Sequence, residues 1–167
     1  MVPEVSNSKL HQVFFDSLDR FLLKTDSDIK FDQRYWTKVF DNCIKPYLRT
    51  IRDVNRVLNV FQFRWGALSN EICFEDLVAI TVLDVLNPQV YRWISENKEM
   101  VCGSPIHSIL MGHKKPEEIR SRYVNELLSI GIENTEDALK SIAALFPVFA
   151  KDVNENSFGY YEDTSCY

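Results

Sequence analysis

The chain has 167 residues, with 24 acidic and 19 basic side chains and a formal net charge of -5. Because non-specific nucleic-acid affinity comes mainly from neutralising phosphates with Lys and Arg, this balance argues against a broad nucleic-acid surface. The composition is 46% hydrophobic and 13% aromatic, which indicates a packed globular body and excludes a disordered or fibrous chain.

The cysteines and the hydropathy pattern indicate where such a protein works. The four cysteines are widely spaced and include no C-x-x-C pair, so we expect reduced thiols. No apolar run approaches the roughly 20 residues that span a bilayer, and acidic residues interrupt any candidate signal peptide. We therefore expect a soluble, cytoplasmic chain without a membrane segment.

Helical periodicity begins close to the N-terminus. Residues 8–24 place apolar side chains three and four apart, which predicts an amphipathic helix. Residues 32–45 repeat the pattern, and Pro46 is expected to end that helix because proline has no backbone N–H. Two helices therefore precede the stretch "RTIRDVNRVLN", which gathers three arginines.

The next two helices carry the charged residues of interest. Thr50 is a suitable N-cap for a helix reaching about residue 65, where Gly66 permits a turn. A further helix is expected before Pro88. Its core, residues 77–86, could alternatively form a buried β-strand, and its apolar run ending in Asp84 superficially resembles the magnesium-holding strand of a P-loop protein. The helix is favoured, because no phosphate loop accompanies that aspartate.

The C-terminal half continues the helical pattern. We expect a short helix over residues 88–97, then an irregular stretch over 101–114 in which residues 105–111 could form one turn. Helices are expected over 115–131 and 134–147, opened by Pro116 and by Asn134 or Thr135. The sequence thus predicts an all-α fold of about six to eight helices. Its helical domain is residues 1–150, and residues 151–167 form a polar loop or tail.

Common catalytic motifs are absent from the sequence. The five glycines form no G-x-x-x-x-G-K-[ST] loop, and neither G-x-S-x-G nor H-E-x-x-H occurs. Cys102, His107 and His113 lie close together in sequence, but a structural zinc site usually needs four well-spaced ligands. We therefore expect no metal site and no catalytic residue acting within this chain alone.

The arginine stretch has two faces if it is helical. At about 100° per residue, Arg52, Arg56 and Asn59 lie within about 60° of one another, and we call these three residues the arginine face. One interpretation is a solvated face that Asp53 partly neutralises. The other is that guanidinium groups bind phosphate, since their planar donors suit it. The opposite side carries Ile51, Val54, Leu58, Phe61 and Trp65.

Residues 48–94 resemble the C-terminal helical part of the KAP family of P-loop NTPases. In that family a Thr-Pro-Arg-x-x-x-Arg-x-x-Asn motif opens a helix, and an apolar helix and an hNPxhYxxI-like turn and helix follow it. Residues 31–48 resemble the preceding family segment, and residues 145–149 resemble a later Leu-Phe-Pro element. The motif positions are matched here by Thr50, Arg52, Arg56, Asn59, Pro88, Tyr91 and Ile94, with Ile51 in place of the usual proline.

This resemblance implies a helical lid. In such ATPases a lid arginine approaches a nucleotide held by a P-loop core, and Arg52 matches that arginine, with Arg56 as its companion. ATP and Mg²⁺ are implied for the complete protein, and both Walker segments would lie before residue 1, in the same or another chain. We therefore expect a fragment or domain without ATPase activity of its own. The family is intracellular and often membrane-associated through helices that this sequence lacks.

Two other functions are compatible with the residues. A helical interaction module could bind a protein partner through an aromatic surface made by Trp36, Trp65, Tyr91 and Trp93. A helix-turn-helix unit over residues 74–96 could bind nucleic acid. In that unit the charges of the second helix are balanced between basic and acidic residues, which makes base reading the less favoured function.

Overall fold

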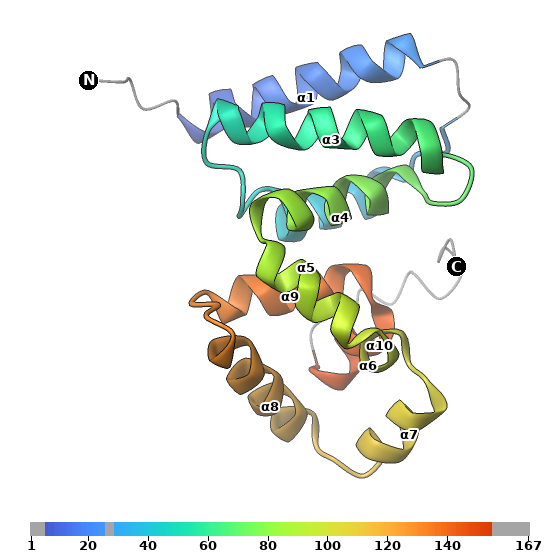
Figure 1. Cartoon of the computed structure of the whole chain (residues 1–167), viewed down its shortest axis with the longest axis vertical. Coiled ribbons are helices and arrows are strands. Elements are labelled where there is room, and N and C mark those ends of the chain that lie inside the picture. Colours follow the sequence, from blue (N-terminus) through green and yellow to red (C-terminus); the bar gives the residue numbers. More distant parts are fainter. Residues whose placement is uncertain (1–5, 26–28, 155–167) are drawn as a thin grey trace. The chain divides into compact units, whose positions relative to one another are not determined.

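A computed structural model describes residues 6–25 and 29–154 of the chain (Figure 1). The described residues form ten α-helices and one π-helical turn, with no strand among them. Eight of the helices have at least seven residues, so the predicted all-α, multi-helix fold is confirmed. None of these helices is long and apolar enough to cross a bilayer. The chain divides into two compact units, residues 1–87 and 88–167.

The first unit is a bundle built around α3. In Figure 1, α3 lies beside α1 and above α4, and it packs against both. The elements of this unit are α1 (Asn7–Lys24), α2 (Gln33–Val39), the π-turn η1 (Phe40–Ile44), α3 (Ile51–Leu68) and α4 (Phe74–Leu86).

Aromatic rings fill the core of this bundle around Phe74, the first residue of α4. Its ring centroid lies 5.4 Å from that of Phe61 and 5.6 Å from that of Trp65, both on α3. Trp36 on α2 lies 5.8 Å away. The Phe61 and Trp65 rings meet Phe74 edge to face, a geometry that adds to the free energy gained by burying each ring. Phe74 therefore joins three helices at one point.

The second predicted helix is interrupted by a π-turn. Asp32 caps α2, accepting from the backbone N–H of Arg34 at 2.8 Å. After residue 39 the backbone adopts π-helical hydrogen bonding. The Lys45 N–H donates to the Phe40 carbonyl five residues earlier, at 2.8 Å. The turn carries Cys43, which is fully buried, and burial raises the pKa of its thiol.

Two carboxyl groups are buried at the start of α4. The Tyr35 hydroxyl donates to Asp76, and the Asp32 backbone N–H donates to Glu75 Oε1 at 3.0 Å. Burial is the main cause that raises the pKa of Glu75 above its ordinary value. Both acidic residues lie in the first turn of α4, where the helix dipole favours them. That they are buried could not be read from the sequence.

Replacing Glu75 with glutamine is expected to stabilise the protein near neutral pH. A raised folded-state pKa means that the folded protein binds more protons than the unfolded one as the pH rises above about 4.5. The Glu75 carboxyl therefore weakens stability through that window, and a glutamine side chain removes the cost while keeping an oxygen for the Asp32 N–H. Urea unfolding between pH 4 and pH 7 measures this. A wild-type advantage that grows with pH would contradict it.

The second unit consists of six helices. They are α5 (Pro88–Glu96), α6 (Lys98–Cys102), α7 (Pro105–Met111), α8 (Pro116–Ser129), α9 (Thr135–Leu145) and α10 (Pro147–Asp152). Within it, α8 and α9 pack on each other, and α10 contacts α6, α8 and α9.

The structure corrects two expectations for this half. The stretch expected to be irregular is largely helical, because Ser104 caps α7 by accepting from the His107 N–H at 3.2 Å and Pro105 occupies the first turn. Pro147, expected at the end of the last helix, begins a further helix, α10. The boundary expected at residue 150 thus falls inside α10. Most of the predicted tail, residues 155–167, lies outside the described residues.

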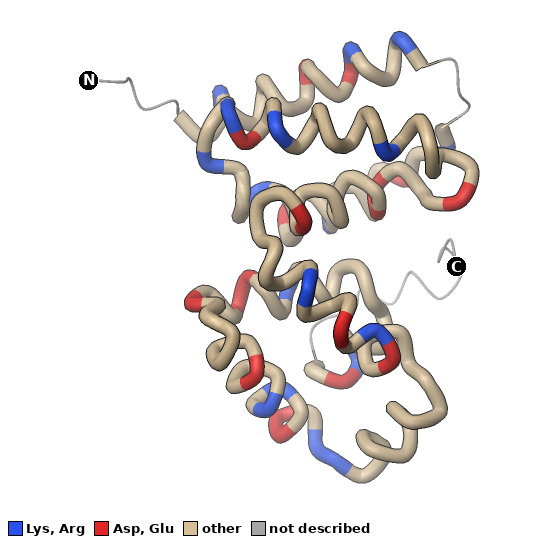
Figure 2. The backbone as a smooth tube through the Cα atoms, in the orientation of Figure 1, with Lys and Arg blue, Asp and Glu red and all other residues tan. Residues whose placement is uncertain are grey.

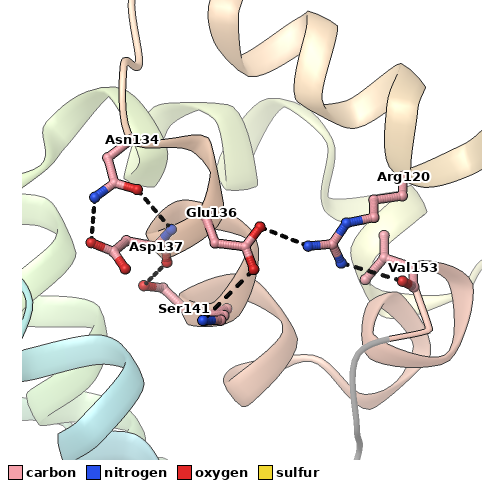
Figure 3. A network of polar contacts seen from close by, with 7 residues as sticks. Arg120, Asn134, Glu136, Asp137, Ser141 and Val153 are labelled. Atoms are coloured by element: carbon pink, nitrogen blue, oxygen red, sulfur yellow. Dashed lines mark hydrogen bonds and ion pairs between the residues drawn. The ribbon is translucent and has the colours of Figure 1, made fainter. Parts of the chain in front are cut away.

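Polar contacts tie α8, α9 and the end of α10 together (Figure 3). Arg120 on α8 donates to Glu136 on α9 at 2.8 Å and to the Val153 carbonyl at 3.5 Å. Asn134 caps α9, accepting from the Asp137 N–H at 3.1 Å. One arginine therefore connects three consecutive segments of the second unit.

The core of the second unit contains a hydroxyl without a hydrogen bond. Tyr123 packs between Trp93 and Phe149, with ring centroids 5.5 and 4.9 Å away. Its hydroxyl oxygen is buried and has no partner in the described part of the chain. Burial, with the nearby charges of Asp152 and Glu126, raises the pKa of Tyr123 to about 12.

Replacing Tyr123 with phenylalanine is therefore expected to leave stability unchanged or to raise it by up to about 1 kcal/mol. The change removes an unsatisfied polar atom and keeps the ring contacts. Thermal and urea unfolding of the variant measure the effect. A loss above about 1 kcal/mol would show that the hydroxyl has a partner, such as a buried water.

Candidate functional site

The N-terminus of α3 is fixed by a reciprocal capping box. Thr50 Oγ1 accepts from the Asp53 N–H at 3.1 Å, and Asp53 Oδ2 accepts from the Thr50 N–H at 2.9 Å. Thr50 is the N-cap that the sequence predicts, and two otherwise unpaired N–H groups are satisfied. The helix runs to Leu68, past the predicted end, because Gly66 keeps a helical backbone and makes no turn.

The apolar side of α3 is buried largely as predicted. The exception is Ile51, which lies in the first turn and is exposed. The buried side of α3 packs against the bundle, so the arginine face on the opposite side points away from the core. The buried residues of α3 are Val54, Val57, Leu58, Phe61 and Trp65.

Arg52 and Asn59 lie on the exposed side of α3. Within the described part of the chain, no hydrogen bond or ion pair engages the Arg52 guanidinium. All five of its N–H groups are therefore available to a ligand. The basic residues along α3 are visible in Figure 2.

Arg56 is placed differently from Arg52. Its Nη2 donates to the Val85 carbonyl at 3.3 Å, in the last turn of α4. A cation there satisfies a carbonyl without a helical partner and complements the α4 dipole. The carboxylate of Asp53 accepts from the backbone N–H groups of Thr50 and Arg49, the latter at 3.3 Å. The solvated-face interpretation had assigned Asp53 to neutralising Arg56.

A second arginine, Arg64, connects α3 to α4. Its guanidinium forms an ion pair with Asp84 and lies 3.5 Å from the Thr81 hydroxyl. The alternative that residues 77–86 form a β-strand is wrong, because they belong to α4. The pairing of Arg64 with Asp84 was not predicted from the sequence. Arg56 and Arg64 are eight residues apart, about two helical turns, and this spacing was the available signal for a basic flank facing α4.

The three residues considered for a metal do not form a site. His107 is buried and contacts Asp152 on α10, whereas Cys102 and His113 are exposed. Across residues 6–25 and 29–154, no group of three or more His, Cys, Asp or Glu side chains could hold a metal ion.

The aromatic surface of the interaction-module alternative is largely absent. Trp65 and Trp93 are buried core residues, so they cannot form a surface together with Trp36 and Tyr91. Burial of large rings in small helical units is the usual outcome, because each ring removes much apolar area from water. The two helices of the helix-turn-helix alternative, α4 and α5, fall in different units.

Comparison with known proteins gives no relative. No protein-family model matches the chain, and no curated protein or solved structure matches it either. The candidate site is therefore defined by its own geometry: a capped helix presenting Arg52 on its exposed side, with Arg56 held against the neighbouring helix.

Proposed function

We propose that the arginine face of α3 contacts the phosphates of a nucleotide held by a segment or chain outside these 167 residues, as the lid of a KAP-type P-loop ATPase would. The observation that carries this proposal is Arg52, whose guanidinium is exposed and engaged by no other described residue. A planar cation with free donors binds phosphate bidentately.

The division between the two arginines sharpens the proposal. Arg52 is the phosphate-contacting residue, and Arg56 holds α3 against the Val85 carbonyl of α4. Movement of Arg52 is thereby coupled to movement of the bundle. A guanidinium directed at the β- and γ-phosphates stabilises the charge that develops during transfer.

The residues fit a phosphate contact but not a complete nucleotide site. Asp84, which superficially resembles a magnesium-holding aspartate, is paired with Arg64. No phosphate loop occurs in the sequence. ATP and Mg²⁺ therefore belong to the partner core, and this chain by itself is expected to show no turnover above a mock-purified control.

Titration of the chain with Mg²⁺-free ATP or inorganic triphosphate, followed by NMR of the arginine Nε–Hε signals, tests the proposal. The Arg52 signal is expected to shift at low salt, with weak affinity and a response that falls as salt rises. In the Arg52→Gln variant, the remaining arginine signals should show no saturable shift. Arg56 should respond less, because one of its donors is already engaged.

Arg92 supplies the internal control, since it is an exposed arginine on a different helix, α5. Equal shifts of the Arg92 and Arg52 signals would reveal general anion attraction and overturn the assignment. So would a saturable response that survives Arg52→Gln.

A further inference from the structure

Helix α7 carries apolar side chains on its outer side as well as its buried one. Its inner side is formed by His107 and Met111, both buried. Its outer side carries Ile106, Ile109 and Leu110, at the i, i+3 and i+4 spacing of one helical stripe, and Ile109 is 78% exposed. A surface helix normally places polar residues outward, so this stripe is an apolar surface without a partner in the described part of the chain.

The stripe is held outward by contacts on the other side of α7. His107 contacts Asp152 of α10, and both side chains are nearly buried. Ser104 caps the N-terminus of the helix. The turn before it requires Gly103, whose φ is +80° and where a Cβ would lie 2.9 Å from Val148. These contacts fix the orientation of α7. Its outer residues are therefore exposed in the folded protein.

The residues that follow the stripe carry charges of both signs. Helix α7 itself contains no charged Lys, Arg, Asp or Glu, and the segment that follows carries Lys114 and Lys115 (Figure 2). Both lysines are exposed and make no ion pair with another described residue. Glu117 and Glu118 come next, in the first turn of α8. The local field is therefore mixed, and binding through it needs the apolar stripe as well as the lysines.

We propose that the outer face of α7, with Lys114 and Lys115, binds the surface of an anionic lipid bilayer. Aliphatic side chains enter the boundary between headgroups and acyl chains while neighbouring lysines contact anionic headgroups, the usual arrangement of interfacial helices. Lys114 and Lys115, exposed and without an ion pair among the described residues, supply the positive charge that an anionic headgroup surface attracts. This proposal is independent of the phosphate contact at Arg52.

Sedimentation of the full chain with vesicles of phosphatidylcholine, with and without phosphatidylserine, tests the proposal. Wild type is expected to bind the anionic vesicles and not the neutral ones. Ile109→Glu should weaken binding about tenfold or more, because it removes apolar area that the bilayer would bury and adds a negative charge. Leu128→Glu is the matched control: Leu128 is 51% exposed on α8, and this change should have little effect. Circular dichroism verifies that both variants are folded.

Charge variants test the electrostatic part in both directions. Lys114→Gln and Lys115→Gln are each expected to weaken binding about fivefold, and Glu117→Gln to strengthen it. No binding to either vesicle type would overturn the proposal and leave a protein as the occupant of this face. Equal losses for Ile109→Glu and Leu128→Glu would overturn it as well.

Discussion

Replacing Phe74 with alanine is expected to lower the free energy of unfolding by about 3–5 kcal/mol. The Phe74 ring is buried and contacts rings from α2 and α3, so its loss leaves a cavity where three helices meet. Such a cavity collapses poorly, because the rings around it are rigid. Urea unfolding followed by tryptophan fluorescence measures the change, since Trp36 and Trp65 both lie against this ring.

Phe63 provides the control for this change. It lies on α3 and is 82% exposed, so Phe63→Ala deletes the same atoms from a solvated position. We expect an effect within about 0.5 kcal/mol. Similar losses for the two variants would show that the Phe74 cluster is not the core of the first unit.

Replacing His107 with alanine is expected to destabilise the protein by about 3 kcal/mol. The imidazole Nε2 contacts the Asp152 carboxylate where the two side chains are only 9% and 14% exposed. Its removal leaves a nearly buried carboxylate without this partner, which costs more than the net contribution of the pair. Thermal unfolding reports the loss, and hydrogen exchange should show that α7 is affected most.

A double-mutant cycle separates the pair from simple loss of volume. We expect a coupling of about 1–3 kcal/mol between His107→Ala and Asp152→Ala. His113→Ala, at an exposed position just after the same helix, should be nearly neutral. Strictly additive losses at residues 107 and 152 would mean that α7 is held by Met111 and its cap alone.

The sequence predicts the long helices well and the short ones poorly. Helix α3 could be placed because its apolar periodicity and its Thr50 cap agree. Helices α7 and α10 have seven and six residues, too few for periodicity to identify them. Their Ser-Pro and Phe-Pro openings were the only signals.

The candidate site shows the same limit. The outward direction of Arg52 follows from the helical period, because the buried seam defines the opposite side. The contact from Arg56 to Val85 does not, since it joins residues 29 positions apart on two helices. The pairing of Arg64 with Asp84, 20 positions apart, could not be read from the sequence for the same reason. Helical periodicity in the sequence gives the direction of a side chain. Its interaction partner on another helix depends on how the two helices pack.

The environment of Cys43 has a practical consequence for chemical labelling. Alkylating reagents attack the thiolate, and Cys43 is buried in η1 with a pKa raised by that burial. Cys102, at the end of α6, is exposed to the same reagents. Modification of Cys102 should therefore be rapid in the folded protein, whereas modification of Cys43 requires the first unit to open. The rate of Cys43 alkylation, measured by pulsed labelling and mass spectrometry, therefore reports how often the first unit opens.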